Sequence, residues 1–141
     1  MNKSSPGSQK VLVVEDEPVI SQICRIVLTG EGFEVDVAVN GDVAQEMLTK
    51  KDYDIVLIDV RTPVMNGKEL YQYICEKHPE LTRRVIFTTG DVTAGKTQQF
   101  LGESGRPFLP KPFTPGELRT VFREAVEEIE GDSAKRDHTD C

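Results

Sequence analysis

The sequence predicts an α/β fold with a doubly wound, five-stranded parallel sheet in the strand order 2-1-3-4-5. Short apolar runs alternate with segments of helical periodicity along most of the 141 residues, and five such pairs predict a parallel sheet with helices on both faces. The second run, residues 33–39, alternates apolar and polar side chains, which is typical of a strand at a sheet edge. An edge position for this strand favours the order 2-1-3-4-5.

The predicted strands are short, and the first is a continuous apolar run, as expected of a strand that is buried on both faces. They cover residues 10–14, 33–39, 55–59, 84–88 and 106–109.

The predicted helices are bounded by residues that begin or end helices. Pro18 suits the first turn of the first helix, and Gly30 or Gly32 ends that helix. Pro79 ends the third helix, and residues 114–117 form a capping box at the start of the fifth. The second and fourth helices are predicted over residues 42–50 and 94–101.

Length and composition indicate one folded domain. We predict this domain over residues 9–130, between a disordered N-terminal segment at residues 1–8 and a disordered C-terminal tail at residues 131–141, because both ends are polar. No apolar stretch approaches the ~18 residues that span a bilayer, so we expect no membrane contact. The N-terminus lacks the apolar core of a signal peptide, which favours a cytoplasmic location.

Charge and cysteine content exclude other classes of function. The formal net charge of −7 repels phosphate backbones, so we expect no nucleic-acid partner. Cys24, Cys75 and Cys141 lack metal-binding spacing and a CxxC motif. Their odd number, without a secretion signal, predicts free thiols in a reducing compartment, with Cys24 as a small buried hydrophobe. No function is assigned to Cys141.

Five residues that follow or end predicted strands carry the candidate chemistry. In an open parallel sheet, ligands bind outside the carboxyl ends of the strands, so these side chains should share one crevice. Three carboxylates, a hydroxyl and an ammonium suit a divalent cation, a phosphoryl group and a carboxylate that accepts it. Magnesium fits, because it takes oxygen ligands from one or two carboxylates plus phosphate. The residues are Glu15, Asp16, Asp59, Thr89 and Lys111.

Each of these residues alone has an ordinary structural explanation. Acidic residues after strands and surface lysines are usually solvated, and Thr89 is a common residue for a strand end. The combination is harder to explain, because carboxylates ~4 Å apart repel by several kcal/mol at an effective dielectric constant near ~20. A hard cation would compensate that repulsion.

These segments resemble the receiver domain of two-component response regulators. The resemblance covers about residues 9–130 and implies the flavodoxin-like receiver fold. The stretch from residue 88 to residue 108 is similar to receivers attached to hybrid sensor kinases. The matching motifs are residues 11–18, 55–67, 85–90 and 108–113.

The resemblance implies a role for each acidic residue. Asp59 would accept a phosphoryl group from a phosphohistidine. Glu15 and Asp16 would hold magnesium directly or through water, and the backbone carbonyl of Arg61 would complete the protein's contacts to the metal. Glu15 replaces the commoner aspartate of the family's acidic pair.

The remaining positions would form the switch that the resemblance implies. Thr89 and Lys111 would each bind a phosphoryl oxygen, and the peptide bond from Lys111 to Pro112 would be cis. Phosphorylation would draw Thr89 inward, and Phe108, at the aromatic switch position, would fill the vacated space. The change would reach the face made by the fourth helix, fifth strand and fifth helix.

The implied function is a receiver in a phosphorelay, either free-standing or part of a hybrid histidine kinase. Such a domain catalyses its own phosphorylation and dephosphorylation. Its implied partner is a histidine kinase or a histidine phosphotransfer domain, and we expect a monomer. The downstream effector has no signature in the sequence.

Two alternatives remain open. A phosphohydrolase of the haloacid-dehalogenase type also uses an aspartate nucleophile, magnesium, a hydroxyl residue and a lysine. It requires a second acid two residues after the nucleophile, where this chain has Arg61. The other alternative is a receiver-like domain that only mediates contacts, against which the complete set of acceptor, acids, threonine and lysine argues.

Overall fold

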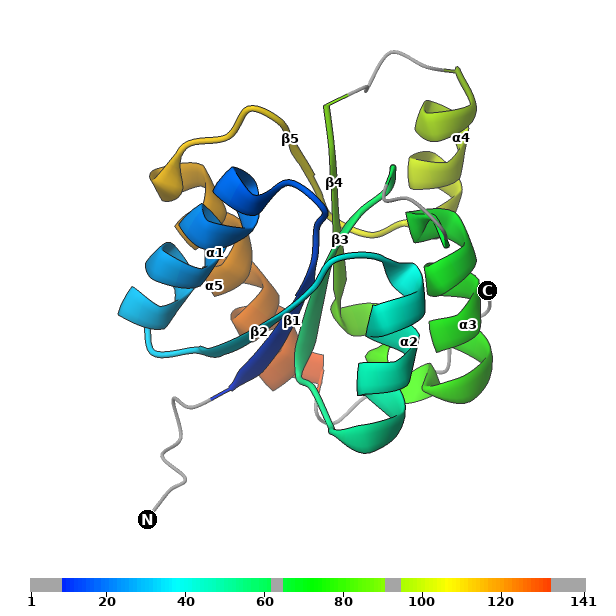
Figure 1. Ribbon diagram of the computed structural model, residues 1–141, viewed down its shortest axis with the longest axis horizontal. Helices are drawn as coiled ribbons and strands as arrows, with labels where there is room; N and C mark the ends of the chain where they lie inside the picture. Colours follow the sequence, from blue (N-terminus) through cyan, green and yellow to red (C-terminus); the bar gives the residue numbers. More distant parts are fainter. Residues whose placement is uncertain (1–8, 62–64, 91–94, 133–141) are drawn as a thin grey trace.

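The computed structural model describes residues 9–61, 65–90 and 95–132, with side chains described up to residue 130. Five parallel strands form one sheet in the order β2-β1-β3-β4-β5, which confirms the predicted order (Figure 1). The strands are β1 (Lys10–Val14), β2 (Glu34–Ala38), β3 (Ile55–Asp59), β4 (Val85–Thr89) and β5 (Phe108–Pro110). The helices are α1 (Pro18–Gly30), α2 (Gly41–Lys50), α3 (Gly67–Lys77), the 3-10 helix η1 (Pro79–Arg84), α4 (Gly95–Ser104) and α5 (Pro115–Asp132).

Helices cover both faces of the sheet and give three layers (Figure 1). On one side, Leu28 of α1 and Phe122 of α5 pack against buried strand residues. On the other side, Leu70 and Ile74 of α3 belong to a second buried cluster, which also includes residues of α2. Because the inner strands are covered on both faces, they need apolar side chains at every position, which explains their continuous apolar runs. Within the described part of the chain, no helix is long and apolar enough to cross a membrane.

The strand register brings the carboxyl ends of the inner strands together. Asp59 of β3 lies opposite Thr88 of β4, and Thr89 lies opposite Pro110 of β5. Both β3 and β4 are buried over their whole length. The polar residues that end these strands therefore lie at one edge of the sheet, inside or next to the core.

The loop after β3 returns closely to the strand, and Gly67 permits this. The Gly67 N–H donates to the carbonyl of Val60 at 3.0 Å. A Cβ atom at position 67 would lie 2.6 Å from the Cα of Val60 and 3.1 Å from the carbonyl oxygen of Asp59. Any side chain there would displace the backbone that immediately follows Asp59.

Some element boundaries differ from the predictions. The 3-10 helix η1 occupies residue 84, where the fourth strand was expected to begin. The fifth strand begins at Phe108, because Pro107 has no N–H to donate to β4. The side chain of Arg106 donates to the carbonyl of Val85 instead, at 3.1 Å. Helix α5 continues to Asp132, two residues into the segment predicted to be a disordered tail. The predicted disordered segment at residues 1–8 and the rest of the tail, residues 133–141, lie outside the described residues.

The cysteines only partly follow the prediction. Cys24 is a buried free thiol, as expected. Cys75 on α3 is disulfide-bonded, so the prediction of free thiols is wrong at this position. An odd number of cysteines is compatible with one pair beside a free Cys24. Cys141 lies outside the described residues.

Candidate functional site

Asp59 is a buried carboxylate at the end of a central strand. Its Oδ1 accepts the backbone N–H of Arg61 at 3.0 Å. Its Oδ2 accepts from Lys111 Nζ at 2.9 Å. The side chain of Arg61 is exposed, whereas that of Asp59 is buried. Both oxygens of the candidate acceptor are thus held in place by donors from two different loops.

Lys111 brings one ammonium to three carboxylates. Its Nζ lies 2.9 Å from Asp59, 3.0 Å from Glu15 and 2.8 Å from Glu17. Its side chain is only 12% exposed. Its backbone N–H donates to the carbonyl of Thr89 at 3.0 Å, and its peptide bond to Pro112 is cis, the geometry that the resemblance implies.

The charged groups of this site shift one another's pKa values. Burial raises the pKa of Glu15 to about 7; the hydrogen bond from Lys111 opposes this effect, while the charge of Asp59 adds to it. Burial lowers the pKa of Lys111, but hydrogen bonds to Glu17, Asp59 and Glu15 outweigh burial and raise it. The lysine therefore stays charged and is the internal counter-ion of the acids.

Glu17 also belongs to this cluster, although it was not among the residues predicted from the sequence. Carboxylate oxygens of Glu15, Glu17 and Asp59 lie within 4.8 Å of one another, whereas Asp16 is exposed and outside this group. Lys111 Nζ contacts both Glu15 and Glu17, so the two glutamates face the same ammonium. The available signal was the spacing of two positions, which would put residues 15 and 17 on one side if the backbone stayed extended. The role of Asp16 as a metal ligand stays a prediction.

The donor set fits a hard divalent cation. Three carboxylates face one ammonium, so the described cluster carries an excess of negative charge. All of its ligand atoms are oxygens, which magnesium prefers. Glu15 and Asp59 are buried, so they have little access to water that would screen their repulsion.

Thr89 and Phe108 lie on neighbouring strands beside the acceptor. Thr89 is fully buried at the end of β4, and its carbonyl joins it to Lys111. Phe108 begins β5, pairs in register with Phe87 and is partly buried against the cluster on the α3 side. The structure thus brings both residues to the predicted strand ends, while their roles as phosphoryl ligand and switch stay predictions.

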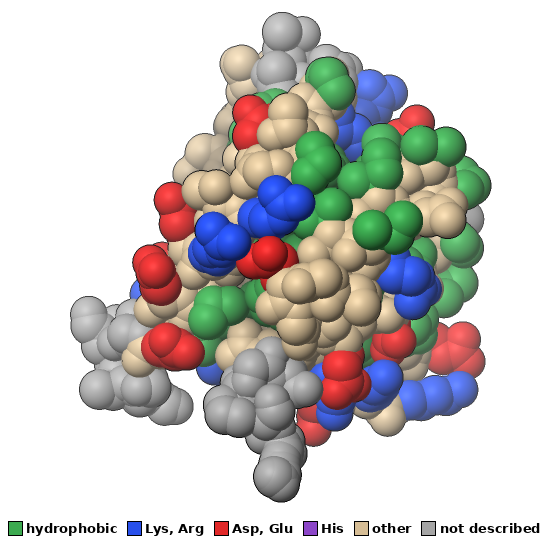
Figure 2. All heavy atoms as spheres, turned by 90° about the vertical axis from the view of Figure 1, so that its left-hand side faces the viewer, with side chains coloured by type: hydrophobic (Ala, Val, Ile, Leu, Met, Phe, Trp, Pro, Cys, Tyr) green, Lys and Arg blue, Asp and Glu red, His purple; other side chains and the backbone are tan. Residues whose placement is uncertain are grey.

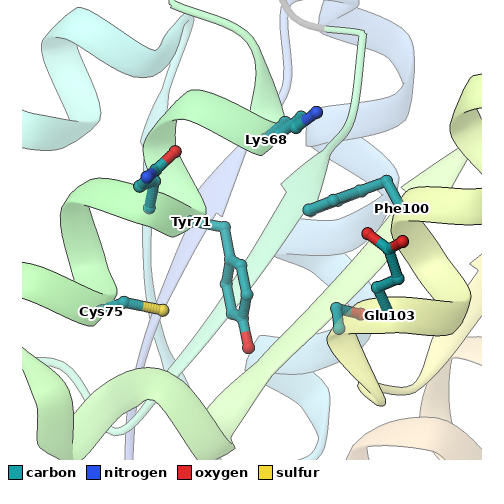
Figure 3. Close-up of a pocket in the computed structure, with 7 residues that line it drawn as sticks. Lys68, Tyr71, Cys75, Phe100 and Glu103 are labelled. Carbon is teal, nitrogen blue, oxygen red and sulfur yellow. The ribbon is translucent and has the colours of Figure 1, made fainter. Parts of the chain in front are cut away.

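A separate pocket of about 190 Å³ lies between α3 and α4 (Figure 3). Phe100 of α4, which lines the pocket, packs edge-to-face on two other aromatic rings. Its ring centroid lies 5.1 Å from that of Phe87 in β4 and 6.0 Å from that of Tyr71 in α3. These contacts attach α4 to the strand that ends at Thr89. The pocket is lined by Lys68, Tyr71, Gln72, Cys75, Phe100, Glu103 and Ser104, and it includes none of the predicted site residues.

Figure 2 shows the side of the molecule on which α1 and α5 lie, and apolar side chains are exposed there among charged ones. On α1, Val19 is 69% exposed and Ile26 is 64% exposed. Val19 follows Glu17 by two residues, so this apolar surface begins directly beside the acidic cluster.

Comparison with known proteins identifies relatives over most of the chain. Residues 11–123 match the response regulator receiver domain family. The response regulator protein PilR of Pseudomonas aeruginosa is 33% identical over 118 residues, which are 84% of this chain and 26% of PilR. The transcriptional regulatory protein ResD of Bacillus subtilis is 34% identical over 110 residues, which are 77% of this chain and 44% of ResD. The sensor kinase CckA of Brucella abortus is 32% identical over 123 residues, which are 86% of this chain and 13% of CckA.

The chain thus spans less than half the length of these three relatives. They are a response regulator, a transcriptional regulatory protein and a sensor kinase, so they do not separate the free-standing receiver from the hybrid-kinase subtype. None of the three is a phosphohydrolase, so they give the haloacid-dehalogenase alternative no support.

Solved structures share the fold. A CheY-like receiver domain protein from Methanospirillum hungatei superposes with a TM-score of 0.81 at 24% identity, over 89% of this chain and 98% of that one. The chemotaxis protein CheY4 of Vibrio cholerae gives a TM-score of 0.74 at 28% identity, over 84% and 98% of the two chains.

Proposed function

The chain belongs to the response regulator receiver domain family, whose members are phosphorylation switches in two-component signalling, and we propose that its acceptor is Asp59. The observation that carries this proposal is the pair formed by Asp59 and Lys111: a buried carboxylate oxygen with an ammonium 2.9 Å away. The donor of the phosphoryl group is a phosphohistidine of a histidine kinase or a histidine phosphotransfer domain.

The transfer step needs positioning and charge neutralisation more than acid–base chemistry. A carboxylate oxygen of Asp59 forms the new P–O bond while the P–N bond to the imidazole breaks, and the electron pair of that bond stays on the imidazole nitrogen. Lys111 neutralises charge on a phosphoryl oxygen, and the hydroxyl of Thr89 donates to another. Hydrolysis of the acyl phosphate returns Asp59 to its carboxylate.

Magnesium fits the acids of this site. Glu15 and Asp59 would hold the ion with the backbone carbonyl of Arg61, and Asp16 would contribute directly or through water. Glu17 belongs to the same group of carboxylates as Glu15 and Asp59. When bound, the ion supplies positive charge to the phosphoryl oxygens. The protein's own contribution is to keep two buried carboxylates beside each other until the cation arrives.

The output of the switch follows from the elements beside Thr89. A phosphoryl group on Asp59 gives Thr89 and Lys111 a new acceptor, and it therefore stabilises the conformation in which both side chains turn toward it. Phe87, two residues before Thr89, pairs with Phe108 in the strand register and packs edge-to-face on Phe100, so a shift of β4 reaches β5 and α4. The face of α4, β5 and α5 is the surface that changes.

The partner that delivers the phosphoryl group has to reach Asp59 past the start of α1. The exposed apolar side chains of Val19 and Ile26 offer it a surface beside the acidic cluster. We expect the chain to act as a monomer that contacts a kinase or phosphotransfer domain there.

The test is covalent labelling. Incubation with magnesium and acetyl phosphate should add one phosphoryl group to the parent protein, as measured by intact mass. Asp59→Asn should take up none, and Glu76→Gln, which changes an exposed acid on α3, should label like the parent. Equal labelling of Asp59→Asn would show that another residue is the acceptor.

A further inference from the structure

The ammonium of Lys111 has no donor to spare. A lysine offers three N–H donors, and the structure gives Nζ three carboxylate partners at 2.8–3.0 Å. A phosphoryl oxygen that arrives at Asp59 therefore has to replace one of these contacts. Which carboxylate leaves determines how readily the lysine becomes available.

Two of the three partners are poorly suited to leave. Glu15 is 2% exposed and also accepts the backbone N–H of Glu17 at 3.1 Å, so its release would leave a buried carboxyl group that has lost its donor and that water cannot reach. Asp59 is itself the acceptor, and its side chain is likewise buried. Neither carboxylate can turn into water when the lysine moves.

Glu17 differs from both. It makes the shortest contact to Nζ, at 2.8 Å, and its side chain is 60% exposed. Water solvates its carboxylate when the contact breaks, so the release costs little. Its position before α1 also leaves it free of helix capping, since its side chain makes no capping hydrogen bond.

We propose that Glu17 is a positioning residue that tethers Lys111 and competes with the phosphoryl group for the ammonium. This inference rests on the proposed function of Asp59 and adds a regulatory element to the same site. Glu17 orients the lysine while the acceptor is unmodified and gives it up when a phosphoryl oxygen replaces the carboxylate. The tether thereby sets how strongly the site favours the phosphorylated state.

The proposal predicts the direction and size of a change in affinity. Loss of the carboxylate at position 17 should tighten the binding of a phosphoryl mimic, because its competitor for Lys111 is gone. Exposed ion pairs shift equilibria by roughly 1.5- to 5-fold, so the gain should lie in that range. If Glu17 acted chiefly as a ligand of the metal, its loss would weaken binding of the mimic.

The experiment is a titration with beryllofluoride at saturating magnesium, followed by amide NMR. Glu17→Gln should bind about 1.5- to 5-fold more tightly than the parent. Glu17→Asp keeps the charge but shortens the arm, so it should also bind more tightly than the parent. Glu76→Gln removes one exposed acid from α3 and should match the parent. Melting temperatures of all four proteins establish that each is folded.

The outcomes separate this inference from the function on which it rests. If the parent binds beryllofluoride and Glu17→Gln binds equally or more weakly, Glu17 is not a competitor for Lys111. If only Glu17→Gln gains affinity while Glu17→Asp matches the parent, the effect is one of net charge and the tether is refuted. If the parent binds no beryllofluoride, the proposed function fails and the tether falls with it.

Discussion

Lys111 Nζ donates to Oδ2 of Asp59 at 2.9 Å, although 52 positions separate the two residues in the chain. The contact joins the end of β3 to the turn between β5 and α5, two elements that the sheet order places on either side of β4. The lysine therefore lies beside the candidate acceptor before any phosphoryl group arrives. The candidate site is therefore organised in advance, and our proposal for Glu17 concerns which carboxylate the lysine gives up.

Lys111→Met should show whether Lys111 acts only in binding the phosphoryl mimic or also in passing the change on to Thr89 and Phe108. The variant keeps the apolar stem but loses a hydrogen bond to a charged group, which contributes ~1.5–3 kcal/mol, so beryllofluoride binding should weaken by roughly 10- to 100-fold. At saturating beryllofluoride, amide NMR shifts should stay near Asp59 in the variant, whereas in the parent they should extend through Thr89 to Phe108. Full propagation in the variant would show that Thr89 alone carries the coupling.

The raised pKa of Glu15 predicts that the magnesium-free protein loses stability as the pH rises. Its pKa is about 7 in the folded state against an ordinary value of 4.5, because burial disfavours the charged carboxylate. Between these values the folded protein binds more protons than the unfolded chain, so stability falls as pH rises. The stabilisation is fully present below pH 4.5 and is lost as pH rises through about 7.

The measurement is a pair of thermal melts at about pH 5 and about pH 8. Glu15→Gln removes the titrating group, so its melting temperature should change less over this range than that of the parent. The upper bound on the parent's loss is about 3 kcal/mol, since one pKa unit corresponds to ~1.36 kcal/mol. Identical pH profiles for the two proteins would contradict the assignment to Glu15.

The sequence predicts the location of this site well because the location depends on periodicity and topology. Alternating strands and helices imply a parallel sheet, and the carboxyl ends of its strands share one edge. Glu15, Asp59, Thr89 and Lys111 each follow or end a strand, so the fold brings them together wherever the exact boundaries fall.

The order of residues along the chain does not by itself show that Glu17 belongs to the cluster. The adjacent pair Glu15 and Asp16 suggests two acids acting together, but neighbours on an extended backbone point to opposite sides. Only the contacts that Lys111 makes with both glutamates show that Glu17 lies on the side of Glu15. The hydrogen bond from Arg106 to the carbonyl of Val85 is likewise tertiary, since the two residues are 21 positions apart.

Magnesium should stabilise the folded protein by mass action. A ligand that binds only the native state adds about 2.7 kcal/mol at ~100 times its Kd, so the melting temperature should rise during a magnesium titration. Asp59→Asn should lose most of this response. Asp16→Asn should show a weaker response than the parent, because an exposed carboxylate can hold the ion through water. An unchanged response in Asp16→Asn would remove Asp16 from the metal site and leave Glu15, Glu17 and Asp59.

Gly67→Ala should slow the labelling of Asp59, although residue 67 is not itself one of the site residues. The added Cβ would lie 2.6 Å from the Cα of Val60 and 3.1 Å from the carbonyl oxygen of Asp59, so the backbone after the acceptor has to move. Overpacking of this kind costs ~1–3 kcal/mol of unfolding free energy, and labelling by acetyl phosphate should slow with it. The matched control is Gly102→Ala in α4, where a Cβ meets nothing within 4 Å and alanine should stabilise the helix by ~0.5–1 kcal/mol. Chemical denaturation gives the free energies and intact mass gives the labelling rates. If Gly67→Ala labels at the parent rate despite a loss of stability, the tight return of the loop serves the fold alone and does not position Asp59.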